Sequence, residues 1–190
     1  MGASTICRGV YTLLDDIVKY MPSAENRKMN GINLKTNEIF EANFDFSKPK
    51  SAYIFKTIVD PFIGRYSLIK VNSGVMKTDD TVYDNGLETE LRLGKLYIMC
   101  GNKTSEISEL QAGDIGAVAK LGDAKTGDTL STKATQISYP AMQISTPYTY
   151  IRYKAKNKND VDKIAQAMTK ISSEDPTFKM VNDADNRQNR

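Results

Sequence analysis

Four basic residues of this chain have the type and spacing to bind phosphate groups: Lys77, Arg92, Lys95 and Lys103. Each lies on or beside a predicted strand or turn, so a rigid sheet would hold their charges in fixed positions. Lysine and arginine held in this way pair with the phosphates of a nucleic acid and position a protein without reading its bases. The net charge is only +3, so such binding would depend on local patches. A charged face that contacts only water is the alternative, and the sequence leaves both interpretations open.

Most catalytic chemistries are excluded by residues that the chain lacks. It has no histidine, and therefore no Ser-His or Cys-His nucleophile pair, no histidine metal ligand and no imidazole base. Cys7 and Cys100 are isolated cysteines that cannot build a zinc site of the usual kind. The sequence has no GxxxxGK[ST] phosphate loop, which would supply a backbone cradle and a lysine for nucleotide phosphates. We expect no catalytic residue, no metal site and no cofactor in this chain.

The elements that must position the basic residues begin with residues 52–76. Apolar and polar residues alternate over 53–58, and aromatic and β-branched types dominate, which predicts a half-buried strand. Asp60, Pro61 and Gly64 mark a turn, because proline fixes its own φ and glycine permits a positive φ. The return strand is predicted over 66–71.

Short predicted strands continue as far as residue 130. They cover 81–84, 91–100, 105–110, 115–121 and 126–130. Turn signals recur about every 8 to 12 residues, which is typical of a closed antiparallel β-barrel. Gly94 lies inside the longest of these strands and predicts a bulge or a close backbone approach. The fold class is therefore mainly β.

Helices are predicted on both sides of the barrel. Residues 9–20 carry one apolar stripe, and residues 160–171 carry another, with Asn159 or Asp160 as N-cap. Predicted strands over 148–153 and 177–181 flank the second helix, giving the first half of a split βαβ unit. The polar residues 23–50 are interpreted as a linker with at most one edge strand.

Taken in order, these residues resemble the bacterial elongation factor G family of ribosomal translocation GTPases. Gly2-Ala3-Ser4, with Gly9-Val10 and the Leu-Leu-Asp at 13–15, is similar to the last guanine-contacting loop and final helix of the family's GTPase domain, with the small residues permuted. The resemblance to the family's second domain, a β-barrel, lies in residues 55–77, 93–99, 109–121 and 125–130. Residues 173–183 resemble the middle of the third domain.

The resemblance implies a fragment with four parts. Residues 1–22 would be the C-terminal helix of a missing GTPase domain, and 23–50 the linker. Residues 51–135 would be the translation-factor β-barrel, and 136–190 a truncated ferredoxin-like βαβ piece of the third domain. The fragment would bind the ribosome and act in translocation, without being an enzyme itself. The full-length parent would be a GTPase that binds GTP and Mg.

The resemblance also implies the partners and their contacts. The barrel would rest on small-subunit ribosomal RNA through Lys77, Arg92, Lys95 and Lys103, and would face the GTPase domain of the parent chain. No apolar run approaches the roughly 20 residues of a membrane span, so we expect a cytoplasmic protein with no membrane and no DNA partner. Two alternatives stay open: a ribosomal protection or release-type paralogue, and a standalone RNA- or protein-binding barrel module.

Eight further residues are candidates for interdomain or switch-facing contacts. They are Asp60, Pro61, Gly64, Gly127, Asp128, Thr129, Asp175 and Thr177. In the family, the first three face the GTPase switch region, and the last two lie near the switch regions and the fusidic acid pocket. The simpler interpretations are an ordinary hairpin turn, a structural turn in which Asp and Thr satisfy backbone groups, and a helix terminator.

Overall fold

The computed structural model describes residues 2–23, 26, 29–60, 64–101, 103–153, 155–157, 160–183 and 188–189. Its helical elements are η1 (Ser4–Ile6), α1 (Val10–Tyr20) and α2 (Val161–Glu174). The strands before residue 95 are β1 (Asn30–Asn33), β2 (Ile39–Glu41), β3 (Ser51–Asp60), β4 (Gly64–Ser73), β5 (Val75–Lys77), β6 (Thr81–Asp84) and β7 (Thr89–Arg92). The later strands are β8 (Leu96–Cys100), β9 (Lys103–Ile107), β10 (Glu109–Gln111), β11 (Ile115–Ala119), β12 (Thr129–Ser131), β13 (Ile137–Ser138), β14 (Asn182–Asp183) and β15 (Gln188–Asn189).

The centre of the molecule is the antiparallel pair β3–β4, which confirms the two strands predicted around the turn at 60–64. Ala52 pairs with Val71, and the register shifts on either side of this pair, next to Ser51 and after Ile54. Pro61 lies outside the described residues. The pair sits in an eight-stranded sheet in the order β7-β6-β12-β3-β4-β11-β8-β9, in which every pairing is antiparallel.

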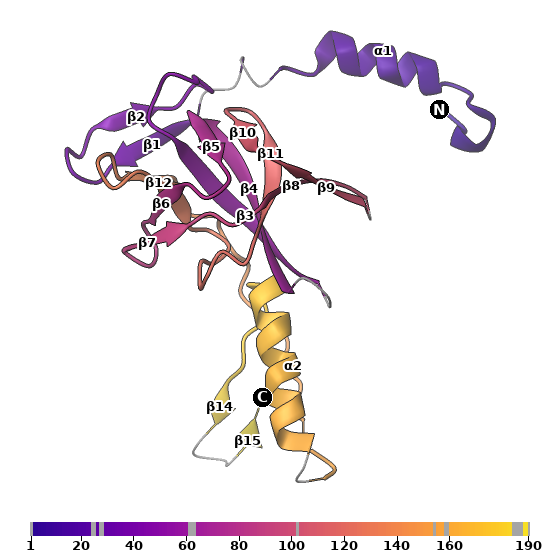
Figure 1. The fold of residues 1–190 in the computed structure, drawn as a ribbon. Coiled ribbons are helices and arrows are strands. Elements are labelled where there is room, and N and C mark those ends of the chain that lie inside the picture. The colour runs from indigo at the N-terminus through magenta and orange to yellow at the C-terminus, as the bar shows by residue number, and fades with distance from the viewer. Residues whose placement is uncertain are drawn as a thin grey trace.

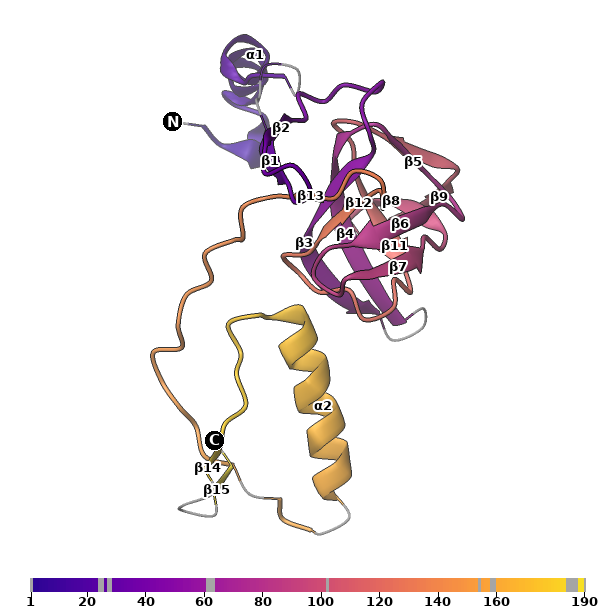
Figure 2. The same ribbon diagram turned by 90° about the vertical axis from the view of Figure 1, so that its left-hand side faces the viewer.

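The sheet curls around one hydrophobic core (Figure 2). The largest side chains of this core include Ile54, Ile69, Met76, Leu93, Leu96, Leu110 and Leu130, all fully buried. Inward positions of β3, β4 and β11 supply most of the middle of the core, as the alternation in their sequences predicts. A separate pair, β5–β10, adds Met76 and Leu110.

The expected closed barrel is not closed by hydrogen bonds. Over the described ranges, β7 and β9 are the two ends of the sheet, and each pairs on one side only. Strand β9 has four exposed residues followed by one partly buried residue. Because it has almost no apolar face to bury, it stays with β8 in a hairpin that projects from the barrel (Figure 1).

A second, three-stranded sheet in the order β13-β1-β2 covers one side of the barrel. Two of its strands lie in the segment 23–50, which was expected to be a linker with at most one edge strand. A buried hydroxyl network attaches this sheet to the barrel. Ser51 Oγ lies 2.6 Å from both Ser73 Oγ and Tyr139 OH, and Tyr139 follows β13 directly.

Replacing Tyr139 by phenylalanine is expected to weaken this attachment. The substitution removes one buried hydrogen bond and keeps the ring, so the free energy of unfolding should fall by about 1 kcal/mol. Urea unfolding of the two proteins measures the difference. Ser51 keeps its bond to Ser73 in this variant. A loss several times larger would mean that the Tyr139 hydroxyl contributes more to the attachment of the small sheet than this single hydrogen bond.

Three turns of the barrel share one backbone arrangement. They are residues 77–80, 111–114 and 125–128. In each turn, Oδ2 of the aspartate at the fourth position accepts the N–H of the first residue, at 3.0, 2.8 and 2.6 Å respectively. The third residue has a positive φ in every case: Asp79, Gly113 and Gly127. We call these the three aspartate turns.

Each aspartate turn is pinned to a residue outside it by two backbone hydrogen bonds. In the first turn, Leu93 O accepts the N–H of Asp79, the third residue, and Leu93 N–H donates to the carbonyl oxygen of Asp80, the fourth residue. Val71 and Ile54 do the same for the second and third turns. The three turns therefore hold the barrel strands to one another at equivalent points.

The two predicted helices are confirmed. The apolar stripe of α1 is exposed from Leu13 onward, where even its least exposed residue, Ile17, has 45% exposure. Helix α2 begins after Asp160, which lies at the N-cap position but makes no capping bond through its side chain. At the other end of α2, Glu174 Oε1 accepts the N–H of Val59 at 2.6 Å and joins the helix to β3.

Five predicted strands differ from the structure. The predicted strand 105–110 is divided between β9 and β10, and the predicted strand 126–130 is mostly the third aspartate turn, because β12 begins only at Thr129. Residues 148–153 and 177–181 are not strands; β14 and β15 pair with each other instead. A strand needs a neighbour to accept its backbone hydrogen bonds, and the described residues place no strand beside these two segments. The predicted strand 91–100 is interrupted, because β7 ends at Arg92 and β8 begins at Leu96.

Candidate nucleic-acid interface

A basic hollow of about 530 Å³ opens on the barrel where the chain passes from β7 to β8. Its lining includes Asp79, Arg92, Gly94, Lys95, Tyr97 and Lys120. Two of the four basic residues singled out in the sequence, Arg92 and Lys95, therefore share one site. Lys120 adds a third cation from the end of β11.

The backbone around Gly94 gives the basic hollow its shape. A Cβ on Gly94 would lie 2.6 Å from Ala119 O, so only glycine allows the two segments to meet. Lys95 O accepts the N–H of Ala119 at 3.2 Å, and Lys120 N–H donates to Arg65 O at 3.0 Å. The close backbone approach predicted for Gly94 is confirmed, and it brings Lys95 and Lys120 to the same hollow.

Tyr97 gives the basic hollow an aromatic wall with a fixed position. Its ring meets the ring of Tyr66 edge to face, with centroids 5.5 Å apart and planes at 84°, a favoured aromatic geometry. Tyr66 is buried, and burial raises the pKa of its hydroxyl. A rigid aromatic wall beside cations is suited to a nucleotide, which offers both phosphate and a ring face.

Carboxylates already neutralise part of the charge of the hollow. Arg92 Nη2 lies 3.1 Å from Asp79 Oδ1, and Lys95 Nζ lies 2.8 Å from Glu106 Oε2. The hydrogen bond to Glu106 raises the pKa of Lys95. Exposed pairs of this kind contribute about 0–1 kcal/mol, so a phosphate could replace the carboxylates at little cost.

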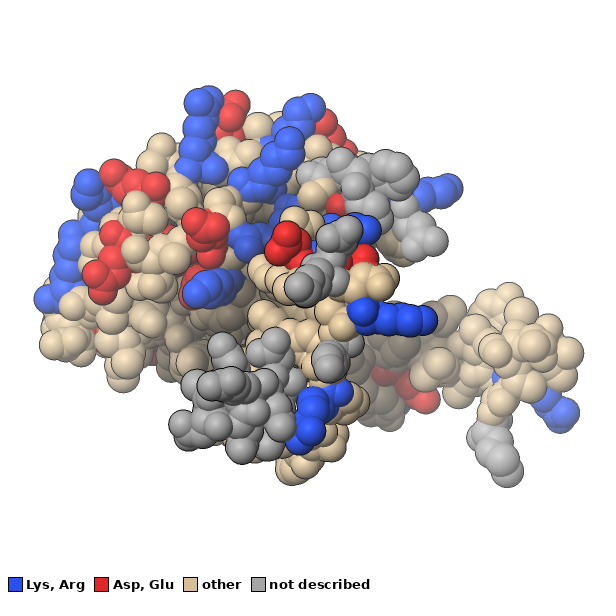
Figure 3. Space-filling view, turned by 90° about the horizontal axis from the view of Figure 1, so that it is seen from below, with Lys and Arg blue, Asp and Glu red and all other residues tan. Residues whose placement is uncertain are grey.

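The other two basic candidates lie outside the hollow. Lys77 is at the end of β5, with Nζ 3.7 Å from Glu109 Oε2, and begins the first aspartate turn. Lys103 is exposed at the start of β9, on the projecting hairpin. On the face seen from below, basic and acidic side chains are intermixed (Figure 3).

Sequence reasoning missed Lys120. It follows β11 in a left-handed conformation, with φ of 56°, and reaches the hollow only because β11 pairs with β8. No spacing in the sequence carries that information. The partly buried pair Lys50–Asp80, with Nζ and Oδ2 2.7 Å apart, was also missed.

The described interdomain candidates do not share one site, although Asp60 and Gly64 lie near the place where the barrel meets α2. Asp60 and Gly64 end β3 and begin β4, close to the bond between Val59 and Glu174. A hollow of about 390 Å³ lies at this junction. Its lining includes Thr57, Arg65, Lys125, Thr126, Ser173 and Pro176. The third aspartate turn thus forms part of one wall.

Gly127, Asp128 and Thr129 have visible structural contacts. Gly127 has φ of 104°, and Asp128 accepts the N–H of Lys125. Thr129 Oγ1 accepts the N–H of Tyr139 at 3.2 Å. Both side chains satisfy backbone groups, in keeping with the structural interpretation of this triplet.

Asp175 and Thr177 line an apolar cavity of about 640 Å³ between α2 and the segment 145–153. Asp175 Oδ1 accepts hydrogen bonds from Thr177 Oγ1 at 2.6 Å and from Thr177 N–H at 2.9 Å. The hydroxyl contact, followed by the backbone contact, lowers the pKa of Asp175. These bonds form the turn that ends α2.

Residues 157–160 read Asn-Lys-Asn-Asp and so have the form Asn-Lys-x-Asp of a guanine-binding motif, which sequence reasoning missed. Asn157 Nδ2 donates to Asp160 Oδ2 at 3.1 Å, immediately before α2. The two side chains that would read a base are bonded to each other. We therefore interpret Asn157 and Asp160 as a local contact that precedes α2.

Metal-binding clusters and membrane-spanning helices are both absent from the described part of the chain. No group of three or more acidic or cysteine side chains there is arranged to hold a metal ion. None of its helices is both long enough and apolar enough to cross a bilayer.

The fold and the basic hollow define an antiparallel β-barrel module suited to phosphate groups. Residues 49–133 match the family model of elongation factor G domain 2. Over 183 residues the chain is 35% identical to an elongation factor G of Karelsulcia muelleri (strain GWSS), an alignment that covers 96% of the chain and 26% of that relative. The chain belongs to the elongation factor G family.

The fold is also similar to that of a solved structure. A crystal structure of a Thermus thermophilus protein matches with a TM-score of 0.73 at 24% identity, covering 95% of this chain and 25% of that one. The chain thus spans about a quarter of the length of the relatives that it matches.

Proposed function

We propose that this chain is a ribosome-binding part of an elongation factor G-like translation GTPase that acts in translocation. The observation that carries the proposal is a coincidence of positions. The residues matched by the domain 2 family, 49–133, are the same residues that form the barrel and the basic hollow. The chain itself does not hydrolyse GTP, and GTP with Mg is bound by the parent protein, in the cytoplasm.

The basic hollow is the part of the barrel that we propose rests on small-subunit ribosomal RNA. Arg92, Lys95 and Lys120 would contact phosphates. For Arg92 and Lys95, the phosphates would replace the ion pairs with Asp79 and Glu106. Phosphate contacts position a protein on RNA and carry no base specificity. Lys77 and Lys103 would extend the contact along the neighbouring strands.

The domain boundaries follow the same proposal. Residues 1–22 are the last helix of the GTPase domain, and the exposed stripe of α1 is the face that this domain would cover. Residues 23–50 connect to the barrel, 51–135 form it, and 136–190 belong to the third domain. The residues that would face the GTPase domain are Asp60, Pro61, Gly64, the triplet 127–129, Asp175 and Thr177.

Removing a cation from the basic hollow should weaken ribosome binding in a salt-dependent way. For Arg92→Ala or Lys95→Ala, the slope of log affinity against log salt should fall by about 1, because one phosphate contact is lost. Co-sedimentation of the chain with ribosomes over a series of salt concentrations measures the slope.

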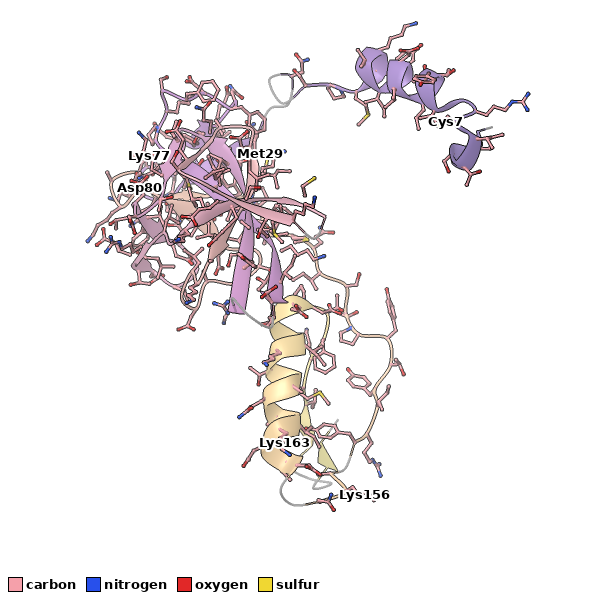
Figure 4. The ribbon with its side chains drawn as sticks, turned by 45° about the vertical axis from the view of Figure 1, so that its right-hand side comes forward. Cys7, Met29, Lys77, Asp80, Lys156 and Lys163 are labelled. Carbon is pink, nitrogen blue, oxygen red and sulfur yellow. The ribbon has the colours of Figure 1, made fainter. Side chains whose placement is uncertain are left out.

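Lys163→Ala is the matched control. Lys163 lies on α2, away from the barrel residues Lys77 and Asp80 (Figure 4), and its side chain is 79% exposed. It should bind with the slope of the unmodified chain. If the chain shows no salt-sensitive binding, or if the hollow variants bind like the control, the proposed contact is wrong.

A further inference from the structure

One carboxyl group in the barrel is fully buried. Asp84, at the end of β6, has 0% exposure. Its Oδ1 accepts the N–H of Gly86 at 2.8 Å and of Leu87 at 3.3 Å. Its Oδ2 is buried as well and has no hydrogen-bond partner among the described residues. A buried ionised oxygen without a donor is costly.

A second carboxyl lies next to this group. Asp128 belongs to the third aspartate turn, and a Cβ on Gly86 would collide with Asp128 Oδ1. Gly86 is thus in contact with Asp128 on one side and bonded to Asp84 on the other. The hairpin turn after β6 and the third aspartate turn meet through these two acids.

The three aspartate turns differ in what faces the aspartate. Asp80 meets the cation Lys50, whose hydrogen bond lowers the pKa of Asp80 although burial raises it. Asp114 is exposed and accepts the N–H of Gln111. Asp128 meets another acid. The same turn geometry therefore occurs in three environments: the aspartate faces a cation in the first turn, solvent in the second and the buried carboxyl of Asp84 in the third.

No described cation compensates Asp84. The charged groups on the elements packed around it are Glu88 on the hairpin turn, Glu90 and Arg92 on β7, Lys133 after β12, and Lys125 and Asp128 on the aspartate turn. Arg92 lies at the far end of β7, opposite Thr81, and pairs with Asp79. Lys133 is paired with Glu90 at 3.1 Å, and both are largely in solvent. Glu88 and Lys125 are exposed. Asp128 is the charge that acts on Asp84.

We propose that Asp84 keeps a proton on Oδ2 to a higher pH than an exposed aspartate does, and that this neutral carboxyl allows the third aspartate turn to lie against the β6–β7 turn. Two ionised carboxylates that lie on either side of the same glycine repel each other, which favours the protonated form of the buried one. Loss of the proton would separate the turns. Because Lys125 and Thr126 line the hollow beside α2, the protonation of Asp84 sets one wall of the barrel–α2 junction.

The electrostatics agree in direction. Burial, followed by the charge of Asp128, raises the pKa of Asp84 above its usual 3.8. The folded state then binds a proton that the unfolded state has lost. The contribution of Asp84 to the free energy of unfolding therefore falls as the pH rises from 3.8 through the raised folded value.

A direct test follows the carboxyl carbon of Asp84 by ¹³C NMR during a pH titration of the whole chain. We expect a midpoint above 3.8 that moves to lower pH in Asp128→Asn, because the neighbouring charge is gone. A midpoint at or below 3.8 in the unmodified chain would overturn the proposal.

A second test uses the isosteric change Asp84→Asn, which imitates the protonated acid. Between pH 3.8 and neutral pH, its unfolding free energy should lack the fall that Asp84 contributes in the unmodified chain. Asp114→Asn is the matched control, since it alters an equivalent turn without a buried acid, and it should keep that fall. If Asp84→Asn keeps the whole pH dependence, the proton is not on Asp84.

Discussion

Replacing Gly74 by alanine is expected to cause a large loss in the free energy of unfolding. Gly74 has φ of 69°, and a Cβ there would lie 2.6 Å from Lys50 Cα and 2.8 Å from Lys48 O. These are backbone atoms, so they cannot rotate away. A left-handed alanine costs about 1–2 kcal/mol by itself.

The displaced backbone would add further losses. Gly74 N–H donates to Asp45 O at 2.8 Å, and Gly74 O accepts the N–H of Ala112 at 3.0 Å. Each weakened bond costs about 1 kcal/mol, so we expect a total loss of about 3 kcal/mol or more. Urea unfolding followed by tyrosine fluorescence measures it, since the chain has ten tyrosines and no tryptophan.

Gly101→Ala provides the control. Gly101 has a similar φ of 59°, but nothing lies within 4 Å of its added Cβ. It should therefore show the backbone cost alone, about 1–2 kcal/mol. Equal losses in the two variants would mean that the close approach of Lys48 and Lys50 to Gly74 adds nothing to the backbone cost of an alanine there.

Truncating Ile69 to alanine should cost about 2–5 kcal/mol, the range for a large aliphatic side chain in a close-packed core. Ile69 is fully buried at the centre of β4, where it pairs with Ile54 on one side and Gly116 on the other. The neighbouring strands are held on both sides, so the cavity cannot collapse easily. Chemical denaturation measures the loss.

Ile115→Ala is the same change one strand away. Ile115 is 56% exposed on β11, and an exposed substitution of this kind is usually within about 0.5 kcal/mol. Comparable losses at the two positions would contradict the assignment of Ile69 to the core and Ile115 to the surface.

The sequence was sufficient for elements whose pattern is local. Alternation over 53–58 and 66–71 predicted β3 and β4, and the apolar stripes predicted α1 and α2, because each pattern matches the period of one element. The glycine at 94 was interpreted correctly for the same reason: its effect is on its own backbone.

Features that depend on distant partners could not be predicted. Strands β1 and β2 are only four and three residues long, and β1 is held by β13 from a distant part of the chain. The segments 148–153 and 177–181 have the composition of strands, but the described residues place no strand beside them. Closure of the barrel depended on β9, whose residues give it no buried face.

The candidate site was only half predictable. Arg92 and Lys95 could be chosen because they are basic residues on or beside predicted strands and turns. Lys120 joins them through the pairing of β11 with β8, and Asp84 becomes unusual through the approach of Asp128. Charge and burial at these two positions are consequences of the register between strands.

The three aspartate turns also bear on the order in which the chain can assemble. Each turn is joined to one strand residue, and the chain between them is short for Leu93, longer for Val71 and longest for Ile54. The entropy cost of closing a loop grows with the logarithm of its length, by about 0.6 kcal/mol for each doubling. Turns with the same hydrogen bonds in the folded state therefore differ in the entropy cost of bringing their partners together. The turn at 77–80 closes the shortest loop and has the lowest such cost.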